Sequence, residues 1–419
     1  MQKLFIKGKT KISGSILISG SKNATLPILA ASILAENVKL TNIPFVKDIF
    51  TMLELLEFIG IRTKIFKKKK IICLQNKKKN SINTLAPYRL VKTMRAGVLV
   101  LGSLLTKFRK AKVSLPGGCA IGSRPVDLHL FALKKLGAKI KIKDGYIIAD
   151  AKNGLLGTKI KFPSISVGAT ENALIAACGA KGESILSNCA IEPEVLDLIY
   201  FLRKLGVKIK VSKRKIFISG NIKLRKNIEH KIIFDRIEAG TYLIAGALIG
   251  KKLTIKKINP KILKCEIGIL KKMGIKISKT GDSIKILESK KLKNINISTK
   301  PYPGFPTDLQ AQLMVLMTQA KGLSKIKENI FENRFMHVPE LKRMGAKIEI
   351  KNKTAHIFGL TKLTGAEVMA TDLRASVSLV LAGLIADNRT MVNRIYHLDR
   401  GYEQLEKKLN KCKAMIRRI

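Results

Sequence analysis

A short phrase recurs along the chain and limits the folds that the chain can adopt. Leucine stands four residues before glycine five times, with the glycines at Gly60, Gly137, Gly206, Gly274 and Gly345. These glycines lie 77, 69, 68 and 71 residues apart, and a degraded sixth copy lies at residues 412–414. Glycine suits the left-handed position that ends a helix, and the alternating residues after each glycine predict a strand. Because the period is too long for a solenoid, we interpret it as a three-element βα unit used six times.

A second phrase keeps the same period, with polar or charged residues followed by an aliphatic stretch rich in small residues. Its copies begin near residues 22–24, 93–96, 167–170, 235–238, 307–310 and 372–375. Helices that are apolar on every side are buried. Buried helices surrounded by strands predict an inside-out arrangement, in which one face of each sheet meets water and carries lysine at alternate positions.

The length of 419 residues exceeds that of one ordinary core, so we predict two domains. The fold class is α/β, with two inside-out α/β domains that are each built from three βα repeat units around buried helices. We expect the first domain to be 22–233 and the second to be 1–21 with 234–419. The sixth unit should lack a final strand, so that the N-terminal residues close the second domain. Two chain crossings, near Ser21 and Ile233, predict a hinge and a cleft that closes on its ligand.

The formal net charge of +51 suggests nucleic-acid binding as one hypothesis. However, the lysines are spread along the chain without the interleaved aromatic residues on which bases stack. We therefore favour a coding bias and predict no nucleic-acid partner. The sequence also predicts no membrane association and a cytoplasmic location, because the N-terminus has no signal-peptide pattern and the apolar run at 377–386 is too short to span a bilayer.

The loop at 116–122 carries Cys119 among Pro116, Gly117, Gly118 and Gly122. A nearby guanidinium such as Arg124 favours a thiolate and makes a cysteine reactive. The alternative is a surface loop with an incidental cysteine. The six cysteines form no CxxC pair and have no histidine at a zinc-ligand spacing, so no metal site and no cofactor are predicted.

Charged residues gather at the predicted starts of the buried helices, where free N–H groups favour phosphate. They are Lys22, Arg95, Asp235, Asp308 and Arg374, and Arg400 follows later in the chain. Each of them, taken alone, is more typical of a salt bridge or a helix cap than of a ligand contact. Their common position favours a site for an anionic ligand.

The motifs at 21–24, 116–129, 305–312, 332–337 and 372–376 resemble the enolpyruvyl transferases that act on UDP-N-acetylglucosamine. The resemblance runs from Met1 to about Glu406. It implies two inside-out α/β domains and transfer of the enolpyruvyl group of phosphoenolpyruvate to the sugar 3-hydroxyl, the first committed step of peptidoglycan synthesis. It also implies small-molecule partners only.

The resemblance further implies roles for individual residues. Cys119 would protonate the methylene carbon of phosphoenolpyruvate, form a covalent adduct with it and be the target of fosfomycin, whereas Asp308 would take the proton of the sugar hydroxyl. Lys22, Asn23, Arg124 and Arg400 would bind phosphoenolpyruvate, with Lys22 and Arg400 counted as catalytic. The contacts to the sugar nucleotide would be Arg95, Arg124, Pro125, Val126, Asp127, Leu128, Ser164, Ile165, Ser166, Val167, Asp308 and Ile330.

Three alternatives stay open at this point. The shikimate-pathway enolpyruvyl transferase has no obvious need for a thiol loop, and Cys119 argues against it. RNA 3′-phosphate cyclase would use a histidine nucleophile, but His129 and His397 stand in no matching motif and are interpreted as hydrogen-bonded structural residues. A basic nucleic-acid-binding protein would bind heparin with a steep salt dependence.

Overall fold

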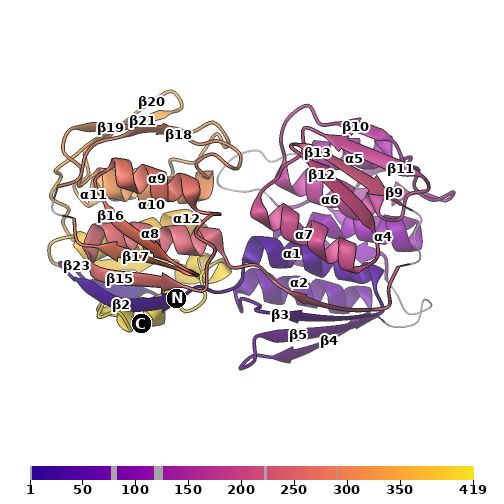
Figure 1. Ribbon diagram of the computed structural model, residues 1–419, viewed down its shortest axis with the longest axis horizontal. Coiled ribbons are helices and arrows are strands. Elements are labelled where there is room, and N and C mark those ends of the chain that lie inside the picture. Colours follow the sequence, from indigo (N-terminus) through magenta and orange to yellow (C-terminus); the bar gives the residue numbers. More distant parts are fainter. Residues whose placement is uncertain (1, 77–82, 118–125, 221–223, 290) are drawn as a thin grey trace. The chain divides into compact units, whose positions relative to one another are not determined.

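The structure, a computed structural model, describes residues 2–76, 83–117, 126–220, 224–289 and 291–419 (Figure 1). These residues divide into two compact units. One contains residues 20–117 and 126–233, and the other contains residues 2–19 and 234–419. We call them the middle unit and the terminal unit. Each contains three of the six sheets, and every sheet has four strands.

The three sheets of the middle unit share one topology, in which a parallel pair is followed by two antiparallel pairings. In spatial order their strands are β14 (Asn227–Lys231), β3 (Asn37–Thr41), β5 (Ile71–Asn76) and β4 (Ile61–Phe66); β6 (Leu85–Ala86), β7 (Lys110–Ser114), β9 (Tyr146–Asp150) and β8 (Lys139–Lys143); and β10 (Lys159–Lys161), β11 (Glu183–Ser187), β13 (Lys215–Ser219) and β12 (Lys208–Ser212).

The terminal unit repeats this topology. Its strands, again in spatial order, are β2 (Ile12–Leu17), β15 (Gly250–Lys256), β17 (Ser283–Leu287) and β16 (Lys276–Thr280); β18 (Asn296–Ser298), β19 (Leu323–Lys327), β21 (Thr354–Phe358) and β20 (Ile348–Lys351); and β22 (Glu367–Met369), β23 (Arg389–Asn393), β1 (Leu4–Lys7) and β24 (Ile416–Arg418).

The six apolar helices predicted from the second phrase are confirmed. Their starts fall where the sequence places them, and nearly all their side chains are buried, as the position of α8 and α10 among the sheets in Figure 1 illustrates. They are α1 (Lys22–Ala31), η3 (Arg95–Leu99) continuing into α4 (Val100–Phe108), α6 (Val167–Ala177), α8 (Arg236–Ile249), η4 (Thr307–Leu309) continuing into α10 (Gln310–Met317), and α12 (Leu373–Ile385).

A second, amphipathic helix in each repeat precedes the recurring glycine or, in the sixth repeat, Lys413. These helices are α2 (Lys47–Ile59), α5 (Asp127–Lys135), α7 (Pro193–Lys204), α9 (Lys264–Lys272), α11 (Val338–Arg343) and α13 (Leu405–Asn410). The repeat is therefore a six-element βαβαββ unit, twice the three elements that the periodicity suggested. Short helical segments complete the chain at η1 (Ser32–Leu34), α3 (Tyr88–Val91) and η5 (Ile395–Arg400).

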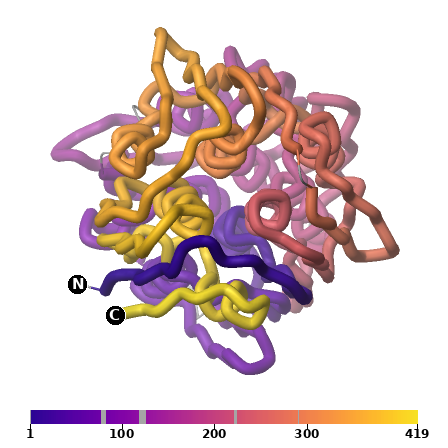
Figure 2. The backbone as a smooth tube through the Cα atoms, turned by 90° about the vertical axis from the view of Figure 1, so that its left-hand side faces the viewer, coloured from indigo at the N-terminus to yellow at the C-terminus, as the bar shows by residue number. Residues whose placement is uncertain are grey.

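The expectation that the sixth unit lacks a final strand is wrong. Strand β24 pairs antiparallel with β1, with Leu4 opposite Arg418, so both strands lie in one sheet. Figure 2 shows the two ends of the chain side by side. The N-terminal residues also supply β2 to a different sheet, where it pairs parallel with β15. The sixth copy of the phrase lacks glycine because Lys413 occupies that position. The strand that follows, β24, is nevertheless formed.

Lys413 adopts the left-handed conformation that the glycines adopt in the other repeats. Its φ is 72°, and the amide of Ala414 donates to the carbonyl of Leu409, as the amide of Ala138 does to that of Leu133 after Gly137. A side chain in this conformation costs roughly 1–2 kcal/mol.

Replacing Lys413 with glycine should therefore raise the free energy of unfolding by about 1 kcal/mol. The mirror variant Gly137→Ala should lower it by about 1–2 kcal/mol through backbone strain alone, because no atom lies within 4 Å of the added Cβ. Urea unfolding of both variants measures the change. Equal stability of Lys413→Gly and the parent chain would contradict the argument.

Exposed lysines lie on the outer faces of the sheets, as the inside-out arrangement predicts. In β8 and β12 the lysines at 139, 141, 143, 208 and 210 are exposed and alternate with Ile or Val. Exposed lysines lie on sheets of both units, including Lys39, Lys252 and Lys325. The charge is thus distributed over several sheets.

Candidate active-site residues

Lys22 begins α1 in the middle unit and is largely buried. Ser21 caps this helix by accepting a hydrogen bond from the amide of Ala24 at 3.3 Å, so Lys22 stands beside the free N–H groups of the first turn. Its ammonium forms an ion pair with Asp48 of α2 at 3.0 Å, and both side chains are at most 10% exposed. Asn23 follows on the same turn and is half-buried. Sequence reasoning missed Asp48, because nothing in the local pattern shows that α2 packs beside α1.

The residues predicted to contact the sugar nucleotide lie at three helix starts of the middle unit. Arg95 is the first residue of η3, Val126 immediately precedes α5, and Ser166 caps α6 by accepting from the amide of Ala169. Around them Asp127, Ser164 and Val167 are exposed, whereas Leu128 and Ile165 are half-buried.

His129 connects these three helix starts. Its ring lies where a Cβ on Gly168 would come within 3.1 Å, and its Nδ1 lies 3.1 Å from the amide nitrogen of Asn172 on α6. Burial, followed by the charge of Arg95, lowers the pKa of His129 to about 4, so the ring is neutral at pH 7. The hydrogen bond to Asn172 confirms the interpretation of His129 as a hydrogen-bonded residue. The predicted nucleotide residues that lie around it are those described in the middle unit, whereas Asp308 and Ile330 belong to the terminal unit.

A group of buried carboxyls in the same unit was not predicted. Glu171 on α6 is 4% exposed, and Glu192 and Glu194 at the start of α7 are similarly buried. Burial raises the pKa of Glu171 well above its ordinary value, and the neighbouring Glu194 and Glu192 raise it further. The sequence offers no signal for this group, since Glu171 lies more than twenty positions before Glu192 and meets it only through the packing of α6 against α7.

Asp308 lies in η4 of the terminal unit, between two guanidiniums. Its Oδ1 accepts from Arg334 at 2.7 Å and its Oδ2 from Arg374 at 2.6 Å, and a quarter of its side chain is exposed. Of the two alternatives for Asp308, the structure shows the salt bridge and not the helix cap, since its carboxylate bonds to two guanidiniums. Asp235 and Asp372, in contrast, do cap α8 and α12.

Arg374 holds its charge despite burial. Burial disfavours the guanidinium, yet the carboxylate of Asp308 raises the pKa of Arg374 above its ordinary value. Arg334 is 4% exposed and was not among the charged helix starts, because it stands in a turn before α11. Its contact with Asp308 is tertiary and has no local pattern.

Glu328 connects the segment of Ile330 to that of Asp308. Its carboxylate accepts from the hydroxyl of Thr307 at 2.9 Å and from the amide of Ile330 at 2.8 Å. The predicted nucleotide contact Ile330 is 36% exposed. Arg400 ends η5 and is half-buried. Cys119, Arg124 and Pro125 lie outside the described residues.

Two of the described cysteines have thiols that are difficult to ionise. Burial raises the pKa of Cys189 to about 12 and that of Cys265 to about 11, so these thiols are poor nucleophiles. Within the described ranges, no three His, Cys, Asp or Glu side chains group as metal ligands, and no helix is long and apolar enough to cross a membrane.

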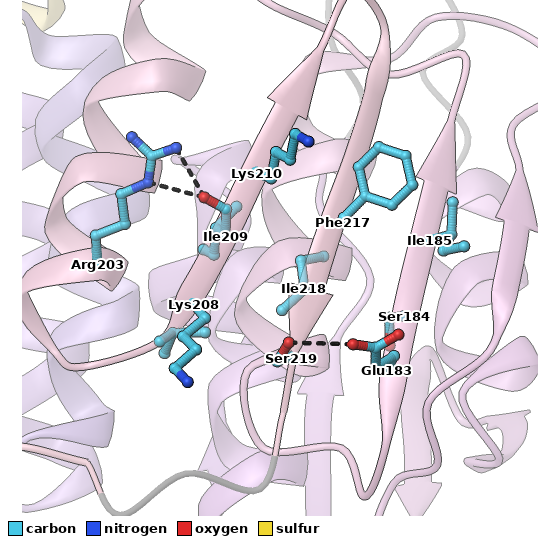
Figure 3. A pocket seen from close by; sticks show the side chains of 11 residues that line it. Glu183, Ser184, Ile185, Arg203, Lys208, Ile209, Lys210, Phe217, Ile218 and Ser219 are labelled. Carbon is cyan, nitrogen blue, oxygen red and sulfur yellow. Dashed lines mark hydrogen bonds between the residues drawn. The ribbon is translucent and has the colours of Figure 1, made fainter.

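A groove of about 570 Å³ lies on the outer face of the sheet formed by β11, β13 and β12 (Figure 3). Ile185 and Phe217 line it, and Arg203 donates from Nε and Nη2 to the carbonyl of Ile209 at 3.0 and 2.7 Å. None of the predicted site residues that the structure describes lines this groove.

Comparison with known proteins shows which class of protein has this fold and these charged helix starts. Residues 6–409 match the family model of EPSP synthase (3-phosphoshikimate 1-carboxyvinyltransferase). The chain therefore belongs to the EPSP synthase family of enolpyruvyl transferases.

Individual proteins similar to this chain carry a more specific name than the family model. The UDP-N-acetylglucosamine 1-carboxyvinyltransferase of Pelagibacter ubique is 59% identical over 421 residues, and that of Rickettsia africae is 50% identical over 420 residues. Each alignment covers all of both chains. The crystal structure of the enolpyruvyl transferase NikO from Streptomyces tendae has a TM-score of 0.90 at 24% identity, covering 100% of this chain and 98% of that one. An EPSP synthase from Acinetobacter baumannii has a TM-score of 0.78 at 18% identity and full coverage of both chains. These two structures support the fold class.

Proposed function

We propose that the chain transfers the enolpyruvyl group of phosphoenolpyruvate to the 3-hydroxyl of UDP-N-acetylglucosamine and releases phosphate, the first committed step of peptidoglycan synthesis. The full-length relatives at 59% and 50% identity carry the name of this activity. The structural observation that carries the proposal is Asp308, a carboxylate fixed by two guanidiniums at the start of a buried helix.

The terminal unit supplies the base. Asp308 takes the proton of the sugar hydroxyl as its oxygen attacks the central carbon of phosphoenolpyruvate. Arg334 and Arg374 fix the carboxylate oxygens, so that little reorganisation is needed during proton transfer.

The loop cysteine supplies the acid, and Lys22 of the middle unit supplies part of the cationic site. Cys119 donates a proton to the methylene carbon, which gives a tetrahedral intermediate. That intermediate loses phosphate together with a proton from the same carbon, and the double bond is restored. Lys22 and Asn23 bind the phosphate beside the N-terminus of α1, as helix starts favour anions. Arg124 and Arg400 complete the phosphoenolpyruvate site.

The sugar nucleotide contacts the helix starts around His129. Arg95 and the cap of α6 offer a guanidinium and free N–H groups to a diphosphate. We assign the remaining contacts to residues 124–128 and 164–167 and to Ile330.

The test is release of phosphate from phosphoenolpyruvate by the purified chain. We expect release only when UDP-N-acetylglucosamine is present, with saturable dependence on both substrates. The matched control supplies shikimate 3-phosphate as acceptor, because the matching family model carries that activity in its name. Release with shikimate 3-phosphate and none with the sugar nucleotide would overturn the proposal.

A further inference from the structure

Tyr402 lies beside Arg374 in the terminal unit and is 2% exposed. Its hydroxyl accepts a hydrogen bond from Nη1 of Arg374 at 3.3 Å, and the guanidinium carbon lies 5.7 Å from the centre of its ring. Because Nη2 of the same guanidinium donates to Asp308, Tyr402 and Asp308 hold the two ends of one planar group. Rotation of that group would break both contacts.

The hydrogen bonds of Thr241 fix the direction of the Tyr402 hydroxyl. Thr241 has a single hydroxyl proton, which it donates to the carbonyl of Ile237 at 2.9 Å. The proton in the 2.8 Å contact between Thr241 and Tyr402 must then come from the tyrosine. The lone pairs of Tyr402 are left to accept from Arg374.

Gln312 on α10 reinforces the same arrangement. Its amide nitrogen lies 3.3 Å from the hydroxyl of Tyr402, 3.2 Å from that of Thr241 and 3.0 Å from the main-chain carbonyl of Asp308. The helix start that carries Asp308 is thereby tied to the tyrosine. Burial is the main cause that raises the pKa of Tyr402, which keeps the hydroxyl protonated over the working pH range.

We propose that Tyr402 is a positioning residue for Asp308, acting through the guanidinium of Arg374, and that Thr241 orients its hydroxyl. The inference rests on the proposed function, in which Asp308 is the base. It assigns to a buried phenol, which touches no substrate in this scheme, control over the geometry of the proton-transfer step.

The variant Tyr402→Phe removes the hydroxyl and keeps the ring. We expect kcat to fall about tenfold, because one hydrogen bond of ordinary strength is lost. KM for both substrates should change less than about twofold, because only an interaction that orients the base is lost. The acidic limb of the pH profile of kcat should move to higher pH, since a carboxylate that loses a well-placed guanidinium binds its proton more tightly.

Tyr242, which follows Thr241 on α8, offers a matched control for the Tyr402 variant. It is fully buried, and its hydroxyl has no hydrogen-bond partner among the residues that the structure describes. Tyr242→Phe therefore removes the same atom from an equally buried ring and should leave kcat and its pH profile at the parent values. A shift in both tyrosine variants would overturn the proposal, because it would show a general effect of repacking.

Thr241 gives a second, independent pair of variants. Thr241→Val removes the acceptor of the tyrosine proton and should shift the pH profile in the same direction as Tyr402→Phe, whereas Thr241→Ser should restore it. Thermal unfolding of every variant separates positioning from loss of folding. Parent-like kcat and pH profile in Tyr402→Phe and Thr241→Val, with or without lower stability, would overturn the positioning role.

The outcome is distinguishable from failure of the proposed function. If the parent chain releases no phosphate with either acceptor, the proposed function and the inference both fall. If the parent is active and an Asp308 variant is not, but Tyr402→Phe behaves like the parent, only the inference falls.

Discussion

Asp308→Ala is expected to bind both substrates and to turn over about 10²–10⁴ times more slowly than the parent chain, which is the usual cost of removing a positioned general base. The carboxylate is the only acceptor in the proposed scheme for the proton of the sugar hydroxyl. Steady-state kinetics of phosphate release, with binding of UDP-N-acetylglucosamine measured by calorimetry, checks both parts.

The variant also leaves two buried guanidiniums without their shared carboxylate, which can cost roughly 3–5 kcal/mol of stability. Asp308→Asn keeps an acceptor oxygen and serves as the variant in which folding is best preserved. Asp387 provides the matched control, since its carboxylate also pairs with two cations, Lys9 at 2.7 Å and Lys362 at 3.1 Å. Asp387→Ala should retain parent activity. Near-normal turnover in Asp308→Ala would show that Asp308 serves only to hold Arg334 and Arg374 in place.

The repeats could be predicted because each repeat is encoded locally. A helix end that needs a left-handed residue selects glycine, and a helix buried on all sides selects small aliphatic residues, so both features are visible in the sequence. The pairing of β1 with β24 was not predicted, because strand pairing between chain ends leaves no local pattern and Lys413 concealed the sixth copy.

The site could be predicted only in part, for a similar reason. Lys22, Arg95, Asp308 and Arg374 stand at helix starts, where their charge has a local explanation. Asp48 and Arg334 reach their partners only through packing between elements that are distant in the sequence. The same holds for Tyr402, which lies 161 positions from Thr241 and 28 from Arg374.

Cys119→Asp is expected to keep substantial activity, whereas Cys119→Ser should lose most of it. A group that protonates carbon must hold its proton at the working pH and release it in the transition state. A thiol near a cation meets this requirement, and so does a carboxylic acid whose pKa is raised by partial burial. A serine hydroxyl is far too weak an acid, although it is the closest in shape to cysteine. Steady-state phosphate release from both variants and the parent chain gives the comparison.

Alkylation by fosfomycin distinguishes the role of the sulfur as a nucleophile from the role of Cys119 as a proton donor. Because an epoxide is opened by a thiolate, inactivation should disappear in both variants while phosphate release persists in Cys119→Asp alone. Cys189 is an internal control, because burial raises the pKa of its thiol to about 12, and Cys189→Ser should leave the rate of inactivation unchanged. Turnover of Cys119→Ser at the parent rate would exclude the acid role. Continued inactivation of Cys119→Ser by fosfomycin would place the reactive thiol elsewhere in the chain.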